Sequence, residues 1–327
     1  MTGSKIGSLE FNIKKAKKEL DEIGAEKLLI QLPEGLKPRV IDFAELFDQE
    51  VTIWGGTCYG ACDLPKNIGD HDALLHVGHS EIPNLDADYP IVYLPGKSTI
   101  FRSPPDRLFE KLDKKVALYA PIQHVHQLNI LEKILSEKSL KPIHGSGDQR
   151  VKHPGQVLGC NYSVKVEDAD HHLYLGTGKF HPLGLSLSLN ENILTYNPYT
   201  QEIDEINEKD RDKFKRKRFA SISKAEECSK IGIIISNKKG QSRYELAKEL
   251  LRNSKDKNLK SVLIELDEIK KKSMTNFQLD CIVNTACPRI TLDDSDKFDP
   301  IILSPDEFRV VLKIKDWETL SVIDEIY

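Results

Sequence analysis

Short apolar runs rich in Ile, Val and Leu alternate with charged, amphipathic stretches along the whole chain. This alternation is typical of β-α units, in which buried strands of a parallel sheet are followed by covering helices. It predicts an α/β fold. The apolar runs form three series: KLLIQLP, EVTIWGG, ALLHVGH and IVYLPG; KVALYAPI, KPIHG, QVLGC, HHLYLG and NILTYNPY; KIGIIIS, SVLIEL, CIVNTAC and IILSPDE.

The three series predict three related domains, each with a small, mostly parallel sheet flanked by helices. A chain of 327 residues exceeds what one hydrophobic core usually organises. The stretch 97–106 is interpreted as the first linker, with a loop as the alternative, and the charged run 207–218 as a solvated helix that joins the second and third domains. The predicted domains are 1–104, 105–205 and 206–327. The other expected helices are 13–23, 37–47, 127–138 and 244–253.

Composition limits the classes of partner. Hydrophobic residues make up 39% and charged residues 30%, and the formal net charge is −4, as in an ordinary globular protein. The run NEKDRDKFKRKR has acidic neighbours, which disfavours a basic patch for nucleic acid. The charged N-terminus lacks a signal peptide's apolar stretch, and no window approaches the roughly 18 apolar residues of a membrane span. We therefore expect a cytoplasmic protein that contacts neither membrane nor nucleic acid directly.

Three cysteines end apolar runs in different series: Cys58 in GTCYGACD, Cys160 in VLGCN and Cys287 in NTACPRI. They are far more widely spaced than the ligands of zinc fingers or ferredoxin loops. Open α/β sheets usually place their ligand sites at the carboxyl ends of strands. The layout predicts one metal site, assembled from the three domains at their junction. Taken alone, Cys58 and Cys160 are each explained equally well by burial of a cysteine at a turn.

The other three cysteines are expected to be structural. Cys62 forms a CxxxC with Cys58, but no third cysteine follows two residues later, so Cys62 is interpreted as packing. Cys228 lies in a charged segment and Cys281 opens an apolar run, and neither has a partner signal. In a cytoplasmic chain of this length, cysteines are better assigned to metal, catalysis or burial than to disulfides.

Three thiolates would leave one corner of a 4Fe-4S cluster open to a substrate, because such clusters normally take four cysteines. Zinc held by three cysteines and a water is the competing assignment. Nitrogen donors are available in PIQHVHQ, where two histidines stand two residues apart as in a metal-binding strand, and further along the chain. These histidines are His124, His126, His171, His172 and His181.

Two further signals lie beside strand ends. The loop GTGKFHPLG carries Gly176 and Gly178, whose backbone N–H groups are candidates for binding an anion, although the spacing matches neither a P-loop nor GxGxxG. Arg289 follows Cys287 by two residues and is a candidate for lowering a thiol pKa, for binding a substrate carboxylate, or for a surface ion pair. QLPEGL and HVGHS end strands in the same manner, and ordinary turn chemistry explains them.

Taken in order, GTCYGACD, PIQHVHQ, VLGCN, GTGKFHPLG and NTACPRI resemble the archaeal diphthamide synthase family, the 2-(3-amino-3-carboxypropyl)histidine synthases. The resemblance spans nearly the whole chain. It implies a homodimer with three related α/β domains per subunit, and an atypical radical S-adenosylmethionine enzyme. Carried over by motif, the ligands of its 4Fe-4S cluster would be Cys58, Cys160 and Cys287.

The resemblance also implies a reaction. The reduced cluster would break the bond between sulfur and the methionine γ-carbon of S-adenosylmethionine. The 3-amino-3-carboxypropyl group would pass to a histidine of translation elongation factor 2, with an electron donor as a further partner. Arg289 is our hypothesis for the methionine carboxylate. The candidates for the remaining cofactor or substrate contacts are Gly176, Gly178, His181, Gln123 and His124.

Two other classes stay open on the residues alone. A zinc-dependent hydrolase or deaminase that uses the three cysteines predicts a colourless protein with bound zinc. A non-catalytic iron–sulfur or nucleotide-binding scaffold predicts a cluster without cleavage of S-adenosylmethionine.

Overall fold

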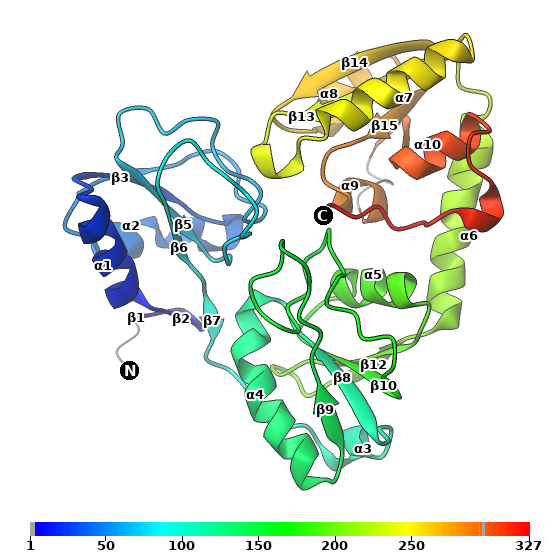
Figure 1. The fold of residues 1–327 in the computed structure, drawn as a ribbon. Coiled ribbons are helices and arrows are strands. Elements are labelled where there is room, and N and C mark those ends of the chain that lie inside the picture. Colours follow the sequence, from blue (N-terminus) through cyan, green and yellow to red (C-terminus); the bar gives the residue numbers. More distant parts are fainter. Residues whose placement is uncertain (1–3, 294, 296–297) are drawn as a thin grey trace. The chain divides into compact units, whose positions relative to one another are not determined.

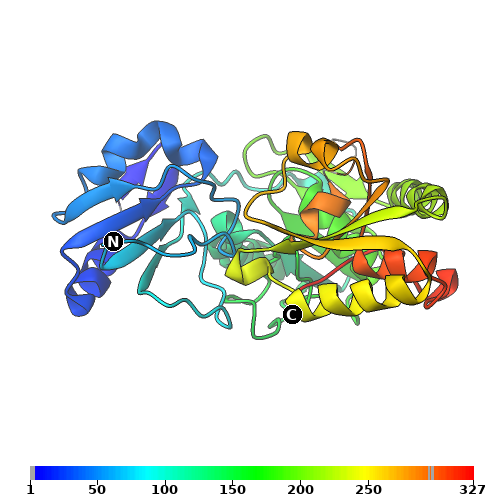
Figure 2. The same ribbon diagram turned by 90° about the horizontal axis from the view of Figure 1, so that it is seen from above.

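The computed structural model describes residues 4–293, 295 and 298–327, and it confirms the α/β prediction (Figures 1 and 2). The described strands form three small sheets in which the registered strand pairs are parallel, and one antiparallel sheet. The three parallel sheets correspond to the three series of apolar runs. The predicted boundaries of three domains stay a prediction.

The first parallel sheet has the order β4-β3-β5-β6. Its two central strands, β3 and β5, carry a near-continuous apolar sequence because both faces are covered; every residue of β5 is buried, whereas the edge strand β4 alternates exposed and half-buried residues. Asn12 caps the N-terminus of helix α1, where its side chain accepts from the Lys15 backbone N–H. Gly24 caps the C-terminus with φ of +73°. The elements are α1 (Ile13–Ile23), β3 (Lys27–Gln31), η1 (Glu34–Arg39), α2 (Val40–Ala44), β4 (Glu50–Ile53), β5 (Ala73–Val77) and β6 (Ile91–Leu94).

A short antiparallel sheet of order β1-β2-β7 accompanies the first sheet. The alternation of apolar residues did not reveal it, because each of its strands is at most three residues long. Its strands are β1 (Ser4–Ile6), β2 (Leu9–Phe11) and β7 (Lys97–Ser98).

The second parallel sheet has the order β12-β11-β10-β8-β9. Its core is made of leucines from β8, β10 and α4, together with Tyr196. Burying each such side chain stabilises the fold by about 1.5–3 kcal/mol. The elements are α3 (Asp106–Phe109), β8 (Lys115–Tyr119), α4 (Ile122–Glu137), β9 (Lys141–Ile143), β10 (His171–Leu175), α5 (Phe180–Leu189), β11 (Ile193–Tyr196) and β12 (Ile203–Ile206).

The third parallel sheet has the order β14-β13-β15-β16. Helix α7 runs along β13 and β14, as Figure 1 shows in yellow and orange. The elements are α6 (Glu208–Ala225), β13 (Lys230–Ser236), η2 (Lys239–Gln241), α7 (Tyr244–Asp256), β14 (Lys260–Leu266), α8 (Lys271–Asn276), β15 (Cys281–Asn284), α9 (Arg289–Leu292), β16 (Ile301–Leu303), α10 (Pro305–Val311) and η4 (Trp317–Thr319).

The chain divides into two compact units. The first comprises the chain through Leu158, Ser163–Gly178 and Asn192–Glu205, and so contains the first two parallel sheets apart from the last residue of β12. The second comprises Gly159–Tyr162, Lys179–Glu191 and Ile206–Tyr327. Cys160 and Cys287 therefore lie in the same unit.

The run QVLGC is not a strand, contrary to the prediction. Gln156 forms an isolated parallel bridge with Ala120, and the run contains no continuous strand. The chain turns at Gly159 and Cys160, so the run does not extend into a strand. Cys160 therefore does not follow a strand of the sheet, whereas Cys58 and Cys287 follow β4 and β15.

Helix α6 confirms the helix predicted from the charged run, but not that it is solvated. A capping box closes its N-terminus, where the Asn207 and Asp210 side chains each accept from the other's backbone N–H. Arg211 and Arg218 lie on its buried face beside Phe214 and Ile222. The charged residues of the run do not by themselves predict that two arginines are buried, because this burial depends on partners that are distant in the sequence.

Cys228 and Cys281 form a disulfide, with Cα atoms 6.0 Å apart. The expectation that the cysteines form no disulfide was wrong for this pair. Parallel pairing of β13 with β15 sets Ile231 opposite Cys281, which brings the segment just before β13 alongside. This proximity depends on register and not on spacing along the chain.

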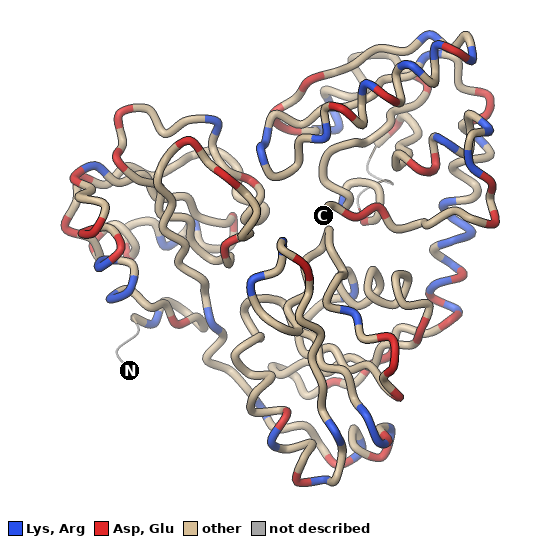
Figure 3. Tube along the Cα trace, viewed as in Figure 1, with Lys and Arg blue, Asp and Glu red and all other residues tan. Residues whose placement is uncertain are grey.

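Among the described residues, none of the helices combines the length and apolarity needed to cross a membrane. Figure 3 shows positive and negative residues interspersed along the chain, as the composition predicts.

Candidate functional site

Cys58 lies in the loop that follows β4, and its side chain is only 2% exposed. Gln31, the last residue of β3, holds this loop. Its amide nitrogen donates to the carbonyl oxygens of Thr57 at 2.8 Å and Asp63 at 2.6 Å. The Asp63 carboxylate in turn accepts from the Tyr59 backbone N–H at 3.0 Å. The loop is thereby folded back around the Cys58 thiol.

Two histidines from the end of β5 face the Cys58 sulfur. His76 Nε2 and His79 Nδ1 each lie 4.0 Å from Sγ and 3.0 Å from one another. His76 Nδ1 lies 2.8 Å from Gln31 Oε1. Because the Gln31 nitrogen already donates to two carbonyls, its oxygen must accept, so His76 Nδ1 carries the proton. The Nε2 lone pair of neutral His76 then points toward Cys58 and His79.

Burial sets the protonation of this trio. Desolvation, reinforced by the Asp63 carboxylate, raises the pKa of the Cys58 thiol to about 12. Desolvation also lowers the pKa of His76 well below its ordinary value and that of His79 to about 4. The metal-free trio is therefore uncharged at pH 7. Its three ligand atoms are close enough together that they could hold one metal ion.

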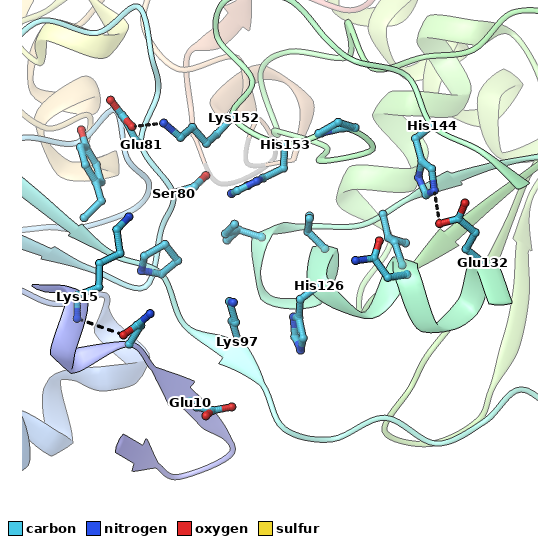
Figure 4. A pocket seen from close by; sticks show the side chains of 18 of the residues that line it. Glu10, Lys15, Ser80, Glu81, Lys97, His126, Glu132, His144, Lys152 and His153 are labelled. Atoms are coloured by element: carbon cyan, nitrogen blue, oxygen red, sulfur yellow. Dashed lines mark hydrogen bonds and ion pairs between the residues drawn. The ribbon is translucent and has the colours of Figure 1, made fainter. Parts of the chain in front are cut away.

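A pocket of about 970 Å³ lies in the first compact unit (Figure 4). Ser80, which follows His79, is part of its wall and accepts from Gln156 Nε2 at 2.6 Å. Lys152 pairs with Glu81 across 2.7 Å. Because Ser80 directly follows His79, this part of the pocket wall adjoins in sequence the trio of Cys58, His76 and His79. Its other basic, acidic and histidine residues are Lys14, Lys15, Lys97, His126, His144, His153, Glu10 and Glu132.

Cys287 lies between β15 and the short helix α9. Asn284, the last residue of β15, shapes this turn. Its amide nitrogen donates to the Cys287 carbonyl at 2.9 Å and to Thr291 Oγ1 at 3.0 Å, and its side-chain oxygen accepts from the Ala286 N–H at 3.1 Å. The cysteine is half-buried. One asparagine therefore holds both sides of the turn that presents Cys287.

The C-terminal tail holds the segment around Cys160. The Ile326 N–H donates to the Cys160 carbonyl at 2.8 Å, and Asn161 Nδ2 donates to the Ile326 carbonyl at 3.1 Å. The Glu325 carboxylate accepts from the Tyr162 N–H at 2.8 Å. The backbone groups that would otherwise lack a strand partner are satisfied by the tail.

Arg243 connects the same tail to the Cys287 turn. Its guanidinium makes a two-point contact with the Asp324 carboxylate at 2.7 and 2.6 Å. It also donates to the carbonyls of Thr285 at 2.8 Å and Ala286 at 3.1 Å. Two segments far apart in the sequence, each carrying a cysteine, are thereby bound to one tail within the second unit.

Phe180, the first residue of α5, lies beside both segments of the second unit. A Cβ on Gly159 would stand 2.4 Å from the Phe180 ring, so only hydrogen fits there. The Arg289 guanidinium lies 4.9 Å from the ring centroid and also pairs with Asp293 at 3.2 Å. The His181 ring lies 5.1 Å from that of Phe180, and desolvation together with the Arg289 cation lowers its pKa to about 4.

The two glycines of the GTGKFHPLG loop differ in what they offer. Gly176 donates its N–H to the Tyr196 carbonyl at 3.0 Å, so that group is engaged in extending the sheet. Gly178 has φ of +73°, which favours glycine. Of the two, only Gly178 is a candidate for presenting its N–H to an anion.

The predicted pair of histidines in PIQHVHQ lies on a helix and not on a strand. Helix α4 begins at Ile122, five residues before the predicted start, and the extended residue Pro121 precedes it. His124 is buried and contacts Gln127 Oε1 at 2.8 Å, while His126 Nε2 contacts the Ser98 carbonyl at 3.0 Å. Residues two apart on a helix do not face one ligand, so this pair is not a metal site. Gln123 is half-buried on the same turn.

The strand ends QLPEGL and HVGHS, which contain Gln31, His76 and His79, were interpreted as ordinary turns, and none of these three residues was predicted as a site residue. The available signal was their position, since Gln31 and His76 end two buried apolar runs. In the structure β3 and β5 are parallel neighbours, with Gln31 directly opposite His76. Polar residues at the ends of adjacent buried strands meet at one sheet edge.

Parallel sheets with a group of one thiol and two imidazoles that could hold a metal ion define an α/β protein with a candidate metal site. The family described as "Putative diphthamide synthesis protein" matches residues 32–322. The chain belongs to this family.

Curated relatives and solved structures agree with this membership. The chain is 35% identical to the 2-(3-amino-3-carboxypropyl)histidine synthase of Pyrococcus horikoshii, over 91% of this chain and 89% of the relative. It is 29% identical to the enzyme of that name from Methanocaldococcus jannaschii, over 88% and 84%. The crystal structure of Dph2 from Pyrococcus horikoshii with a 4Fe-4S cluster matches with a TM-score of 0.87 at 34% identity, covering 97% of this chain and 94% of that one.

Proposed function

We propose that this protein is a 2-(3-amino-3-carboxypropyl)histidine synthase that performs the first step of diphthamide formation. It transfers the 3-amino-3-carboxypropyl group of S-adenosylmethionine to a histidine of translation elongation factor 2. The observation that carries this proposal is a match over nearly the whole chain, in sequence and in fold, to a synthase of that name and to a cluster-bearing structure.

The donor set fits a 4Fe-4S cluster. Such clusters are held by cysteine thiolates, and four cysteines lie outside the disulfide. We assign Cys58, Cys160 and Cys287 as the ligands and leave Cys62 as packing. When bound, the cluster supplies an iron for the substrate and the electron that breaks the bond between sulfur and the methionine γ-carbon.

Arg289 is proposed to bind the methionine carboxylate of S-adenosylmethionine. Its planar guanidinium matches a carboxylate with two parallel hydrogen bonds. The side chain is half-exposed, and its pairing with Asp293 is single and solvent-accessible, so exchange for a substrate carboxylate costs little. The neutral His181 ring close by adds no competing charge. The other proposed contacts are Gly178, His181, Gln123 and His124, together with Gly176 through groups other than its N–H, which is hydrogen-bonded to the Tyr196 carbonyl.

The partners follow from the chemistry. The protein substrate is elongation factor 2, and a one-electron donor must reduce the cluster. A net charge of −4 steers little over long range, so docking depends on local contacts. The homodimer stays a prediction, which light scattering against the 37.1 kDa subunit mass measures.

Single Cys→Ala variants test the ligand set. After anaerobic reconstitution, the variants of Cys58, Cys160 and Cys287 should each lose iron, sulfide and the visible absorption of the cluster. They should also lose dithionite-dependent formation of methylthioadenosine, because each removes one thiolate. Cys62→Ala is the matched control and should retain all four.

Full iron and sulfide in the Cys160 variant would overturn the assigned ligands. A colourless wild-type protein with zinc and no methylthioadenosine would instead support the zinc hydrolase. A cluster with no cleavage would support the scaffold.

Arg289→Ala tests the carboxylate contact. Loss of a charge-assisted hydrogen bond costs about 1.5–3 kcal/mol, so KM for S-adenosylmethionine should rise roughly 10- to 100-fold. Cluster content should be unchanged. Arg39→Ala, which removes an exposed arginine paired with Asp42, is the control, and an unchanged KM in the Arg289 variant contradicts the assignment.

A further inference from the structure

Cys58, His76 and His79 offer a metal a set of ligands that differs from the three cysteines. We propose that, in the cluster-free protein, these three side chains bind one zinc ion and thereby compete with the iron–sulfur cluster for the Cys58 thiolate. The competition rests on the proposed function. The zinc site rests only on the geometry of the trio.

The distances suit a single ion. Zinc bonds of about 2.3 Å to sulfur and 2.0–2.1 Å to nitrogen sum to slightly more than the observed 4.0 Å between Sγ and each imidazole nitrogen. The two nitrogens are 3.0 Å apart. One ion among the three atoms therefore needs only small side-chain rotations. One thiolate and two imidazoles are donors that zinc prefers over carbonyl or carboxylate sites.

The outer partners of this site are already built. A metal-binding histidine almost always donates its second ring N–H to an acceptor, which fixes its tautomer. His76 does so to Gln31, and Gln31 is itself held by two backbone carbonyls of the Cys58 loop. His76 and Gln31 are opposite each other on paired strands and fully buried. The His76 lone pair is thus aimed before any metal arrives.

Binding needs two proton movements. The contact between His76 Nε2 and His79 Nδ1 holds one proton. His79 must therefore take the tautomer with its proton on Nε2, which frees both facing lone pairs. The Cys58 thiol releases its proton to solvent as the zinc–sulfur bond forms. The three protein ligands leave a fourth tetrahedral position for water.

Cobalt tests the site directly. Chelator-treated protein, kept anaerobic with a thiol-free reductant, is titrated with Co²⁺. We expect one Co²⁺ per chain, a sulfur-to-cobalt charge-transfer band and the intense visible bands of tetrahedral coordination. These signals should vanish in Cys58→Ala and fall strongly in His79→Asn and His76→Gln.

Matched cysteine and histidine variants separate this site from the cluster. Cys160→Ser keeps the trio, so it should bind cobalt as the wild type does although it forms no cluster. His79→Asn keeps all three proposed cluster cysteines, so it should form the cluster, which also shows that it folds. His71→Ala, elsewhere in the same unit, is the histidine control. Wild type without charge transfer, or histidine variants with wild-type cobalt affinity, would overturn the zinc site.

Gln31→Met tests the hydrogen-bond partner of His76 without removing any of the three proposed zinc ligands. Losing an outer partner of this kind typically weakens metal affinity about 10- to 100-fold. Competition with a chromogenic chelator for Zn²⁺ measures that change. An affinity equal to that of wild type contradicts the role of Gln31 in fixing His76.

The order of metal addition tests the competition. Wild-type protein loaded with one equivalent of Zn²⁺ should reconstitute its cluster more slowly than metal-free protein, and a chelator should restore the rate. His79→Asn should show little zinc inhibition. Equal inhibition of cluster reconstitution in both proteins would mean that zinc acts elsewhere, and it would refute the competition. If cobalt binds as expected but no cluster forms in the wild type, the proposed function alone would be refuted.

Discussion

At the scale of single residues, Gly159 decides how the segment carrying Cys160 packs. The Phe180 ring occupies the space where a side chain would begin, and the same ring lies under the Arg289 guanidinium. The absence of a Cβ therefore matters more here than backbone freedom. Gly159 is therefore required for packing against Phe180 as well as for the turn beside Cys160.

Gly159→Ala should destabilise the protein by about 1–3 kcal/mol, the usual cost of overpacking. It should also lower the iron bound after reconstitution, because the displaced ring disturbs the Cys160 segment. Urea unfolding and iron analysis measure the two effects. Gly35→Ala, where a Cβ meets nothing within 4 Å, is the control, and adding Phe180→Leu to Gly159→Ala should recover part of the loss.

At the scale of elements, α6 is fastened to α10 by an ion pair that is almost completely buried. Arg218 donates to both carboxylate oxygens of Glu307, at 2.7 and 2.6 Å, and to the Ile302 carbonyl at 2.7 Å. Glu307 also accepts from the Ser304 N–H as part of the α10 capping box. The ion pair holds helix α6 against α10 and against β16, the last strand of the third parallel sheet.

Arg218→Met should cost about 3–5 kcal/mol of unfolding free energy, because it leaves the Glu307 carboxylate buried without its cation. The double variant Arg218→Met/Glu307→Leu should recover most of that loss. Chemical denaturation of the metal-free protein measures both. A double variant no more stable than Arg218→Met would show that packing, and not the unpaired charge, dominates.

At the scale of the whole molecule, the chain passes between its two compact units several times. The second unit takes Gly159–Tyr162 and Lys179–Glu191 in addition to its C-terminal part. Within that part, the disulfide joins cysteines separated by 53 residues. The bond restricts the unfolded chain more than it adds contacts.

Reduction of Cys228–Cys281 should lower the unfolding free energy by about 4 kcal/mol, between the chain-entropy values for loops of about 15 and 100 residues. Unfolding with and without a phosphine reductant, on metal-free protein, measures the difference. Cys228→Ser/Cys281→Ser should match the reduced wild type and respond no further to reductant. A reductant-independent stability in wild type would contradict a contribution from this bond.

The sequence by itself determined the α/β class, because buried parallel strands demand continuous apolar runs and their helices demand amphipathic ones. It also predicted the limits of α1, whose apolar period and caps are local. The five motifs were enough to indicate the family. These signals are readable because each depends on neighbours along the chain.

Only the tertiary structure decided what the site residues touch. The Cys160 segment depends on a tail more than 160 residues away, and the histidines beside Cys58 depend on the register of β3 with β5. The disulfide likewise depends on β13 pairing with β15. Strand register and tail contacts are long-range, so no pattern within a run encodes them. The alternation of apolar and charged runs therefore predicts the sheets, and the pairing of those runs places the thiols and imidazoles.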